Sequence, residues 1–244
     1  MPHVSSKTRT GVILAAGFGS RLQGVSDETR LKPLTPVAGR PLILRTIDSL
    51  SIAGCSRVVV VLGYGAADVE EAVSGAYSGN LELRFAVNAQ YQLQNGLSVL
   101  AARPFVGAEF LVTMADHVFG DSVMELAAAH RPPVGGATLL VDYKLDTIFD
   151  MDDATKVLAV DGRISRIGKQ IEDYNCVDTG LFVCTGGLMT AIDEVYQAKG
   201  DASLSDGVQA LAAKKLMHVL DVKDGFWQDV DTPAMLEHAN RMLS

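Results

Sequence analysis

The chain has 244 residues, of which 48% are hydrophobic and 20% are charged, a composition typical of one large α/β domain or of a core with a small appendage. Its formal net charge of −8 argues against a broad nucleic-acid-binding surface. The amino terminus lacks the apolar core of a secretory signal and the longest apolar run, 58–62, is too short to cross a bilayer, so we expect a soluble cytoplasmic protein.

The first half of the chain alternates short apolar runs with helical patterns. Runs at 12–16, 58–62 and 110–114 are typical of strands buried on both faces of a parallel sheet. Helices are expected at 41–53, 66–73, 96–102 and 121–130. This alternation predicts a doubly wound α/β sheet with helices on both faces.

After Arg131-Pro132-Pro133 the pattern changes, and strands become more frequent. Asp161-Gly162 predicts a tight hairpin turn between two of them. The expected strands are 137–141, 156–160, 164–167, 176–184 and 217–222, and the expected helices are 186–198, 203–213 and 233–243. We predict a single domain spanning 1–244 whose two halves meet near residue 133. The three cysteines, Cys55, Cys176 and Cys184, lack metal-ligand spacing and are interpreted as core thiols.

A glycine-containing turn, GFGSR, follows the first strand at 17–21. Glycines lack a Cβ atom, so backbone N–H groups can close on an anion, and Arg21 can add positive charge. Taken alone, such a turn leaves an ordinary structural turn as an alternative. A dinucleotide-binding oxidoreductase is excluded, because its third glycine would fall at Leu22. Lys32 follows, between two stretches whose backbone is restricted. Without these neighbours it would be interpreted as a solvated surface lysine.

The segment 11–42 resembles the signature of the sugar-phosphate nucleotidyltransferase superfamily, LAAGxGxRL followed by KPLxPVxGxPL. The resemblance implies a Rossmann-like mixed, mainly parallel sheet and transfer of a nucleotidyl group to a small phosphorylated acceptor, with release of pyrophosphate. It places the nucleotide in the half at about 8–133 and the acceptor in the half at about 134–244. It also makes Arg21, Lys32 and Asp116 catalytic. The residues implied to bind nucleotide are Ala15, Ala16, Gly17, Gly19, Ser20, Arg21, Lys32, Gln94, Gly96 and Ser98.

Three acids are candidates for a metal site. Asp116 follows an apolar strand, where open α/β sheets place their ligands, and Asp229 and Asp231 lie in WQDVDTP near the end of the chain. Asp116 could instead cap the next helix, and Asp231 or Thr232 could cap the helix that starts at Pro233. Magnesium prefers carboxylate oxygens, and the resemblance implies that Mg²⁺ is the cofactor and that all three acids lie near it. The sequence does not choose between Asp229 and Asp231 as the inner ligand. His117 is interpreted as a positioning residue or a bystander.

Two segments bear on the substrates. QNGLS at 94–98 lies where the family reads the base, although an ordinary turn and helix cap would look the same. Its Asn-Gly-x-Ser form, DATKV at 153–157 and the following IGK are similar to CTP:inositol-1-phosphate cytidylyltransferases. The resemblance therefore implies cytidylyl transfer from CTP to inositol 1-phosphate, giving CDP-inositol. It implies acceptor binding by Lys156, Lys169 and Asp178, although Lys156 could equally lie on a strand edge.

Alternative functions are the same chemistry on a sugar 1-phosphate or on phosphocholine, and a non-catalytic relative that senses nucleotide. An aromatic content of 6% with the single Trp227 makes a choline site unfavourable. The presence of Arg21, Lys32 and Asp116 argues against a non-catalytic relative. The expected partners are small molecules, without nucleic acid or membrane insertion. A homodimer and a separate membrane CDP-alcohol transferase acting downstream are left open.

Overall fold

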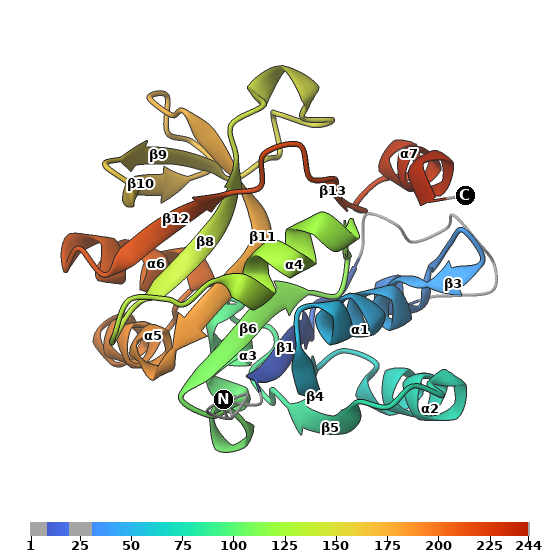
Figure 1. The fold of residues 1–244 in the computed structure, drawn as a ribbon. Helices are drawn as coiled ribbons and strands as arrows, with labels where there is room; N and C mark the ends of the chain where they lie inside the picture. The colour runs from blue at the N-terminus through green and yellow to red at the C-terminus, as the bar shows by residue number, and fades with distance from the viewer. Residues whose placement is uncertain (1–8, 20–30, 244) are drawn as a thin grey trace, which may run out of the picture.

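The structure, a computed structural model, describes residues 9–19 and 31–243 (Figure 1). Within them, the main sheet runs in the order β5-β4-β1-β6-β11-β8-β12-β10-β9. Its strands are β1 (Arg9–Ala15), β4 (Cys55–Leu62), β5 (Glu82–Val87), β6 (Glu109–Met114), β8 (Ala137–Asp142), β9 (Lys156–Val160), β10 (Arg163–Gly168), β11 (Cys176–Thr185) and β12 (Met217–Asp221). Strands β5, β4, β1 and β6 are parallel, whereas β11 is antiparallel to both β6 and β8. The mixed sheet confirms the predicted fold class.

Helices cover both faces of this sheet because the central strands are apolar on both sides (Figure 1). In β1, Val12 and Leu14 pack with α3, α5 and α6, whereas Ile13 and Ala15 pack with α1, α2 and α4. The helices are α1 (Leu42–Ile52), α2 (Ala66–Ala76), α3 (Gly96–Ala101), α4 (Asp121–Ala129), α5 (Gly186–Lys199), α6 (Leu204–Ala213) and α7 (Pro233–Leu243). None of the helices within the described ranges combines the length and the apolar character that crossing a membrane requires.

Several strands were not predicted from the sequence. The edge strand β5 carries Glu82 and Arg84 and is only partly buried, so it has no continuous apolar run. The other missed elements are very short: β2 (Pro36–Val37), β3 (Arg40–Pro41), β7 (His117–Phe119), β13 (Trp227–Asp229), and the 3-10 turns η2 (Lys32–Leu34), η3 (Arg103–Phe105) and η4 (Leu145–Thr147). Tertiary pairing stabilises such short strands, and local sequence periodicity does not report it.

One of these short pairings brings the end of the chain back to the centre of the sheet. Strand β13 pairs antiparallel with β7, so that Asp229 lies opposite His117. The backbone N–H of Val230 then donates to the carbonyl of Asp116 at 2.9 Å. Helix α7 follows and packs over the β2–β3 hairpin, with Val37 and Ala239 in one small apolar cluster. The acids of WQDVDTP are thereby fixed beside the carboxyl end of β6.

The three cysteines are free thiols buried in the core, which confirms their interpretation from the sequence. Burial raises the pKa of Cys55 and of Cys176 to about 12, and that of Cys184 further still. Thiols that stay protonated in this way are inert at neutral pH.

Candidate active site

Two cavities open beyond the carboxyl ends of β1 and β6, where open α/β sheets bind their ligands. The first, of about 410 Å³, is lined by residues 14–19, from the end of β1 into the glycine-containing turn. The second, of about 610 Å³, lies on the side of β11 and β13. The residues common to both linings are Asn95, Met114, Asp116 and Asp231. Ligands bound in the two cavities would therefore meet at the carboxylates of Asp116 and Asp231.

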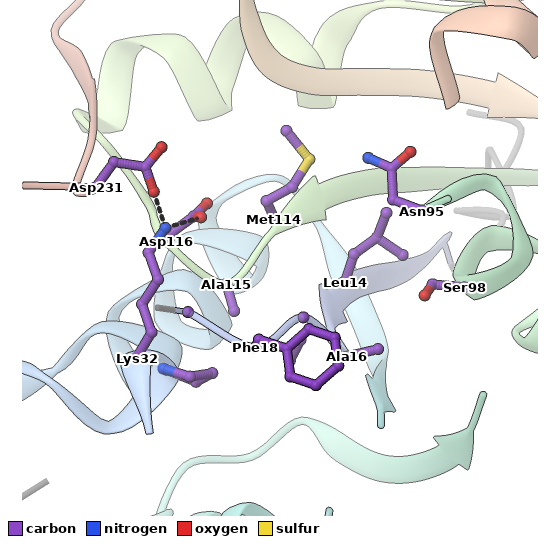
Figure 2. Close-up of a pocket in the computed structure, with 14 residues that line it drawn as sticks. Leu14, Ala16, Phe18, Lys32, Asn95, Ser98, Met114, Ala115, Asp116 and Asp231 are labelled. Carbon is purple, nitrogen blue, oxygen red and sulfur yellow. Dashed lines mark hydrogen bonds and ion pairs between the residues drawn. The ribbon is translucent and has the colours of Figure 1, made fainter. Parts of the chain in front are cut away.

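Lys32 lies at this meeting point. Its ammonium donates to Oδ2 of Asp116 at 2.5 Å and also to Oδ1 of Asp231, as Figure 2 shows. Pro33 lies within the same 3-10 turn and is buried, which restricts the backbone that carries the lysine. Burial lowers the pKa of Lys32, but the two carboxylates outweigh this effect and hold its pKa above the ordinary value. Lys32 is therefore a fixed positive charge between the cavities.

Asp116 and His117 form a second charged pair at the same point. His117 Nδ1 lies 2.6 Å from Oδ1 of Asp116. Burial favours the protonated acid, but Lys32 and His117 reverse this preference and lower the pKa of Asp116. Burial likewise opposes protonation of His117, yet the charges of Asp116, Asp229 and Asp178 hold its pKa above the ordinary value. The neighbouring carboxylates therefore favour the protonated form of the imidazole.

Asp178 differs from Asp116 in that no lysine or arginine of the described residues forms an ion pair with it, although the charge of His117 acts on it. Its Oδ1 accepts a hydrogen bond from the N–H of Gly180 at 2.7 Å. Burial nevertheless raises its pKa to about 6. The side chain lines the second cavity, where a carboxyl group of this kind can exchange hydrogen bonds with a hydroxyl group.

The acids predicted to hold a metal come together in two overlapping groups. In the first group, Asp231 is joined to Asp116 through Lys32. In the second group, one carboxylate oxygen each of Asp153, Asp229 and Asp231 lies within 4.8 Å of the others. Burial raises the pKa of Asp229, and Asp231 and Asp116 add to this effect. This concentration of carboxylate oxygens fits a hard cation such as Mg²⁺. Asp153, which was not among the metal candidates taken from the sequence, is added to them by the tertiary structure.

Most of the residues predicted to bind nucleotide line the first cavity. They are Ala15, Ala16, Gly17, Gly19, Lys32 and Ser98. Gly19 has a φ of +61°, and an added Cβ atom would lie 2.4 Å from Cβ of Lys32, so only glycine allows the turn to approach that lysine. Ser20 and Arg21 lie outside the described residues.

Gln94 and Gly96, which were also predicted to bind nucleotide, do not line that cavity. Gly96 is packed against the loop before α6: its N–H donates to the carbonyl of Ala202 at 3.1 Å, and an added Cβ atom would lie 2.4 Å from that oxygen. Gln94 is exposed, and its N–H donates to Asp201 at 2.9 Å. The glycine is therefore needed for packing between α3 and α6. Asn95, between them, lines both cavities instead.

Of the three predicted acceptor residues, Lys169 and Asp178 line the second cavity. Lys156 does not; its ammonium donates to the carbonyl of Lys169 at 3.2 Å and lies over the ring of Tyr174. Lys156 thus supports the loop that carries Lys169 and does not face the cavity.

A wall of the second cavity was missed from the sequence. Trp227 Nε1 donates to Oδ2 of Asp142 at 2.9 Å, and its ring is stacked against His117 with centroids 6.4 Å apart. These three residues come from β13, β8 and β7. Of these residues, Asp142 carried no signal in the sequence, whereas Trp227 adjoins the acids of WQDVDTP and His117 follows Asp116.

Comparisons with known proteins agree with this geometry. The chain is 33% identical over 234 residues to the bifunctional IPC transferase and DIPP synthase of Aquifex aeolicus, covering 96% of this chain and 51% of that protein. It is 34% identical to the protein of the same name from Rubrobacter xylanophilus, covering 100% of this chain and 54% of the relative. The chain thus spans about half the length of these two curated relatives.

The same likeness is found among solved structures. The inositol-1-phosphate CTP transferase from T. maritima superimposes with a TM-score of 0.83 at 28% sequence identity, over 96% of both chains. Residues 11–147, more than half of the chain, match the family described as the MobA-like NTP transferase domain. They contain the glycine turn, Lys32 and Asp116, which carried the resemblance in the sequence. The chain belongs to the family of MobA-like NTP transferase domains.

Proposed function

We propose that the chain transfers a cytidylyl group from CTP to inositol 1-phosphate in a Mg²⁺-dependent reaction, giving CDP-inositol and pyrophosphate. The observation that carries this proposal is the junction of the two cavities at Lys32, Asp116 and Asp231. Nucleotidyl transfer needs two phosphate-bearing substrates whose reacting atoms meet among fixed charges. The first cavity takes the triphosphate and the second takes the acceptor.

The chemistry requires little from the protein beyond position and charge. An oxygen of the acceptor phosphate attacks the α-phosphorus, a new P–O bond forms, and the bond to pyrophosphate breaks. That oxygen is already deprotonated at neutral pH, so no general base is required. Lys32 stabilises the negative charge that develops on the phosphates. Bound Mg²⁺, held by Asp116, Asp229 and Asp231, would supply further neutralisation and orient the leaving pyrophosphate.

The choice of CTP and inositol 1-phosphate is supported by two kinds of likeness. The T. maritima structure, whose name specifies inositol 1-phosphate and CTP, matches this chain over 96% of both. The bifunctional relatives named IPC transferase are 33% and 34% identical. Because this chain spans only about half of those relatives, their complete activities are not transferred to it. We include a cytoplasmic location and a downstream CDP-alcohol transferase in the proposal on the basis of the family resemblance.

A second acceptor class is a phosphonate. The CMP-5'-(3-aminopropyl)phosphonate synthase of Streptomyces rubellomurinus is 32% identical over 96% of this chain, which covers 38% of that relative. Its name specifies a CMP product on a phosphonate. This relative and the inositol-1-phosphate CTP transferase therefore have names that specify cytidine nucleotides but different acceptors. The second cavity, with Asp178, Asp142 and Trp227 in its wall, is suited to a hydroxylated ring.

The test is pyrophosphate release with Mg²⁺, pairing each of CTP, UTP, dTTP, GTP and ATP with inositol 1-phosphate, glucose 1-phosphate, phosphocholine and an aminoalkyl phosphonate. We expect strong release only with CTP and inositol 1-phosphate. Release with another pair would keep nucleotidyl transfer and replace the substrates. No release with any pair would reject the enzymatic proposal and favour a nucleotide-sensing relative.

A further inference from the structure

The acceptor-side lysine is already bound to an anion of the protein itself. The ammonium of Lys169 lies 2.6 Å from Oδ1 of Asp153, and both side chains line the second cavity. Asp153 is carried by the loop between η4 and β9, and Lys169 by the loop after β10. Lys156 holds the second loop through the carbonyl of Lys169. The loop after β10 therefore places the ammonium in the cavity, and Asp153 of the loop before β9 neutralises it.

The Asp153 carboxylate lies close to the other acids of the site. One of its oxygens lies within 4.8 Å of carboxylate oxygens of Asp229 and Asp231. Asp231 in turn shares Lys32 with Asp116, at the junction of the two cavities. Asp153 thus holds an anionic group between the acceptor-side lysine and the charges where the two substrates meet. The attacking phosphate of an acceptor has to reach the same place.

Asp153 and an acceptor phosphate cannot both be held closely by Lys169. Each is an anion, and Asp229 and Asp231 already concentrate negative charge beside them. The Asp153 and Lys169 side chains are 30% and 49% exposed, and ion pairs with this much exposure to solvent are weak, so the pair can open. A phosphomonoester dianion, with more charge and more acceptor oxygens than a carboxylate, is the kind of ligand that can displace the aspartate.

We infer that Asp153 is an exchangeable counter-ion that occupies the acceptor-phosphate subsite and is displaced from Lys169 when a phosphomonoester binds. The inference rests on the proposed function for the identity of the acceptor. It deepens that function by assigning to Asp153 the control of acceptor-phosphate affinity. The tethered carboxylate competes with every incoming anion, so it raises the affinity for Lys169 that a ligand needs in order to occupy the subsite.

The direct test is a titration with inorganic phosphate, followed by the fluorescence of Trp227, which lines the same cavity and is the single tryptophan of the chain. We expect Asp153→Asn to tighten phosphate binding by about two- to fivefold, because a competing ion pair of this exposure has been removed. Asp152→Asn is the matched control: it makes the same charge change at an exposed neighbour that does not line the cavity, and it should leave binding unchanged.

A second pair of variants ties the effect to Lys169. Lys169→Gln should weaken phosphate binding, and adding Asp153→Asn in that background should give no further tightening. Unchanged or weaker binding in Asp153→Asn would overturn the inference, and so would tightening that persists without Lys169. A titration with dimethyl phosphate, a monoanion, should show the same relative gain in Asp153→Asn as inorganic phosphate, because a competing counter-ion lowers the apparent affinity of every anion by the same factor. A gain confined to one of the two anions would contradict displacement of Asp153 from Lys169.

Turnover separates this inference from the proposed function. If Asp153→Asn lowers the KM for the phosphorylated acceptor and leaves the KM for nucleotide unchanged, the counter-ion role is supported. If it raises the half-saturating Mg²⁺ concentration with no change in acceptor KM, Asp153 is a metal ligand and the inference fails while the proposed function stands. If no substrate pair releases pyrophosphate but phosphate binding tightens through Lys169, the proposed function fails and the anion-exchange inference stands on binding.

Discussion

The ammonium of Lys32 joins Asp116 to Asp231, two acids that lie 84 and 199 residues away from it in the chain. The lysine side chain is 12% exposed and the two acids are 24% and 11% exposed. Buried charges of this kind are stable only when they are paired, so the three side chains position one another. The network also lies where the two cavities meet, which makes it the first target for mutagenesis.

Replacing Lys32 with methionine should abolish most of the activity. Met has a similar length but no charge, so developing negative charge on the phosphates would lose its fixed cation. We expect kcat to fall by about 10²- to 10³-fold, measured as pyrophosphate release. Lys214→Met, which removes a half-exposed surface lysine paired with Glu194, is the control and should leave kcat unchanged. A fall of less than a few-fold in Lys32→Met would show that the lysine has only a structural role.

The carboxylates should determine the metal requirement. We expect Asp116→Asn to lower turnover by at least about 10²-fold and chelation of Mg²⁺ to abolish it. Asp229→Asn and Asp231→Asn should each raise the half-saturating Mg²⁺ concentration, and the larger shift identifies the inner ligand. Asp224→Asn, which replaces an exposed acid that lines the second cavity, is the control for these Mg²⁺ measurements. Turnover of Asp116→Asn within a few-fold of the parent chain would contradict the metal-site assignment.

Stability should depend on Arg9, which closes the carboxyl end of α4. The residue is 4% exposed, and its guanidinium donates to the carbonyls of Ala127 and His130 as well as to Glu109. A cation at a helix carboxyl end complements the helix dipole, and its removal takes this donor from the buried carbonyl of Ala127. We expect Arg9→Met to lower the free energy of unfolding by about 2–4 kcal/mol, measured by urea denaturation. Arg241→Met, on the exposed face of α7, should cost less than about 0.5 kcal/mol.

His130 should make stability depend on pH. Burial lowers its pKa, and the charges of Arg9, His218 and Arg131 lower it further. Since the unfolded chain then binds a proton more readily than the folded chain, this contribution is complete above the unfolded pKa of about 6.5 and decreases as the pH falls. NMR titration of the imidazole protons should give a pKa below that of an unfolded histidine. A pKa above the unfolded value would contradict this assignment.

The amino-acid sequence alone determined the central part of the fold. Strands β1, β4 and β6 are continuous apolar runs because both of their sides are covered by helices, so their pattern was visible locally. Edge strand β5 was missed because one of its sides faces solvent and its sequence mixes charged and apolar residues. The glycine turn and Lys32 were predicted as site residues because their spacing along the chain is a family signature, and Asp116 because it follows an apolar strand.

The tertiary structure decided the rest of the site. The pairing of β13 with β7 brings Asp229 and Asp231 to Asp116, and no local pattern could specify that three-residue strand. The same long-range packing directs Gly96 against Ala202 and turns Lys156 toward the loop of Lys169. It also places Asp153 beside Asp229 and Asp231. Sequence supplies the chemical groups, but loop packing determines which of them face one cavity, because side-chain direction depends on contacts between residues far apart in the chain.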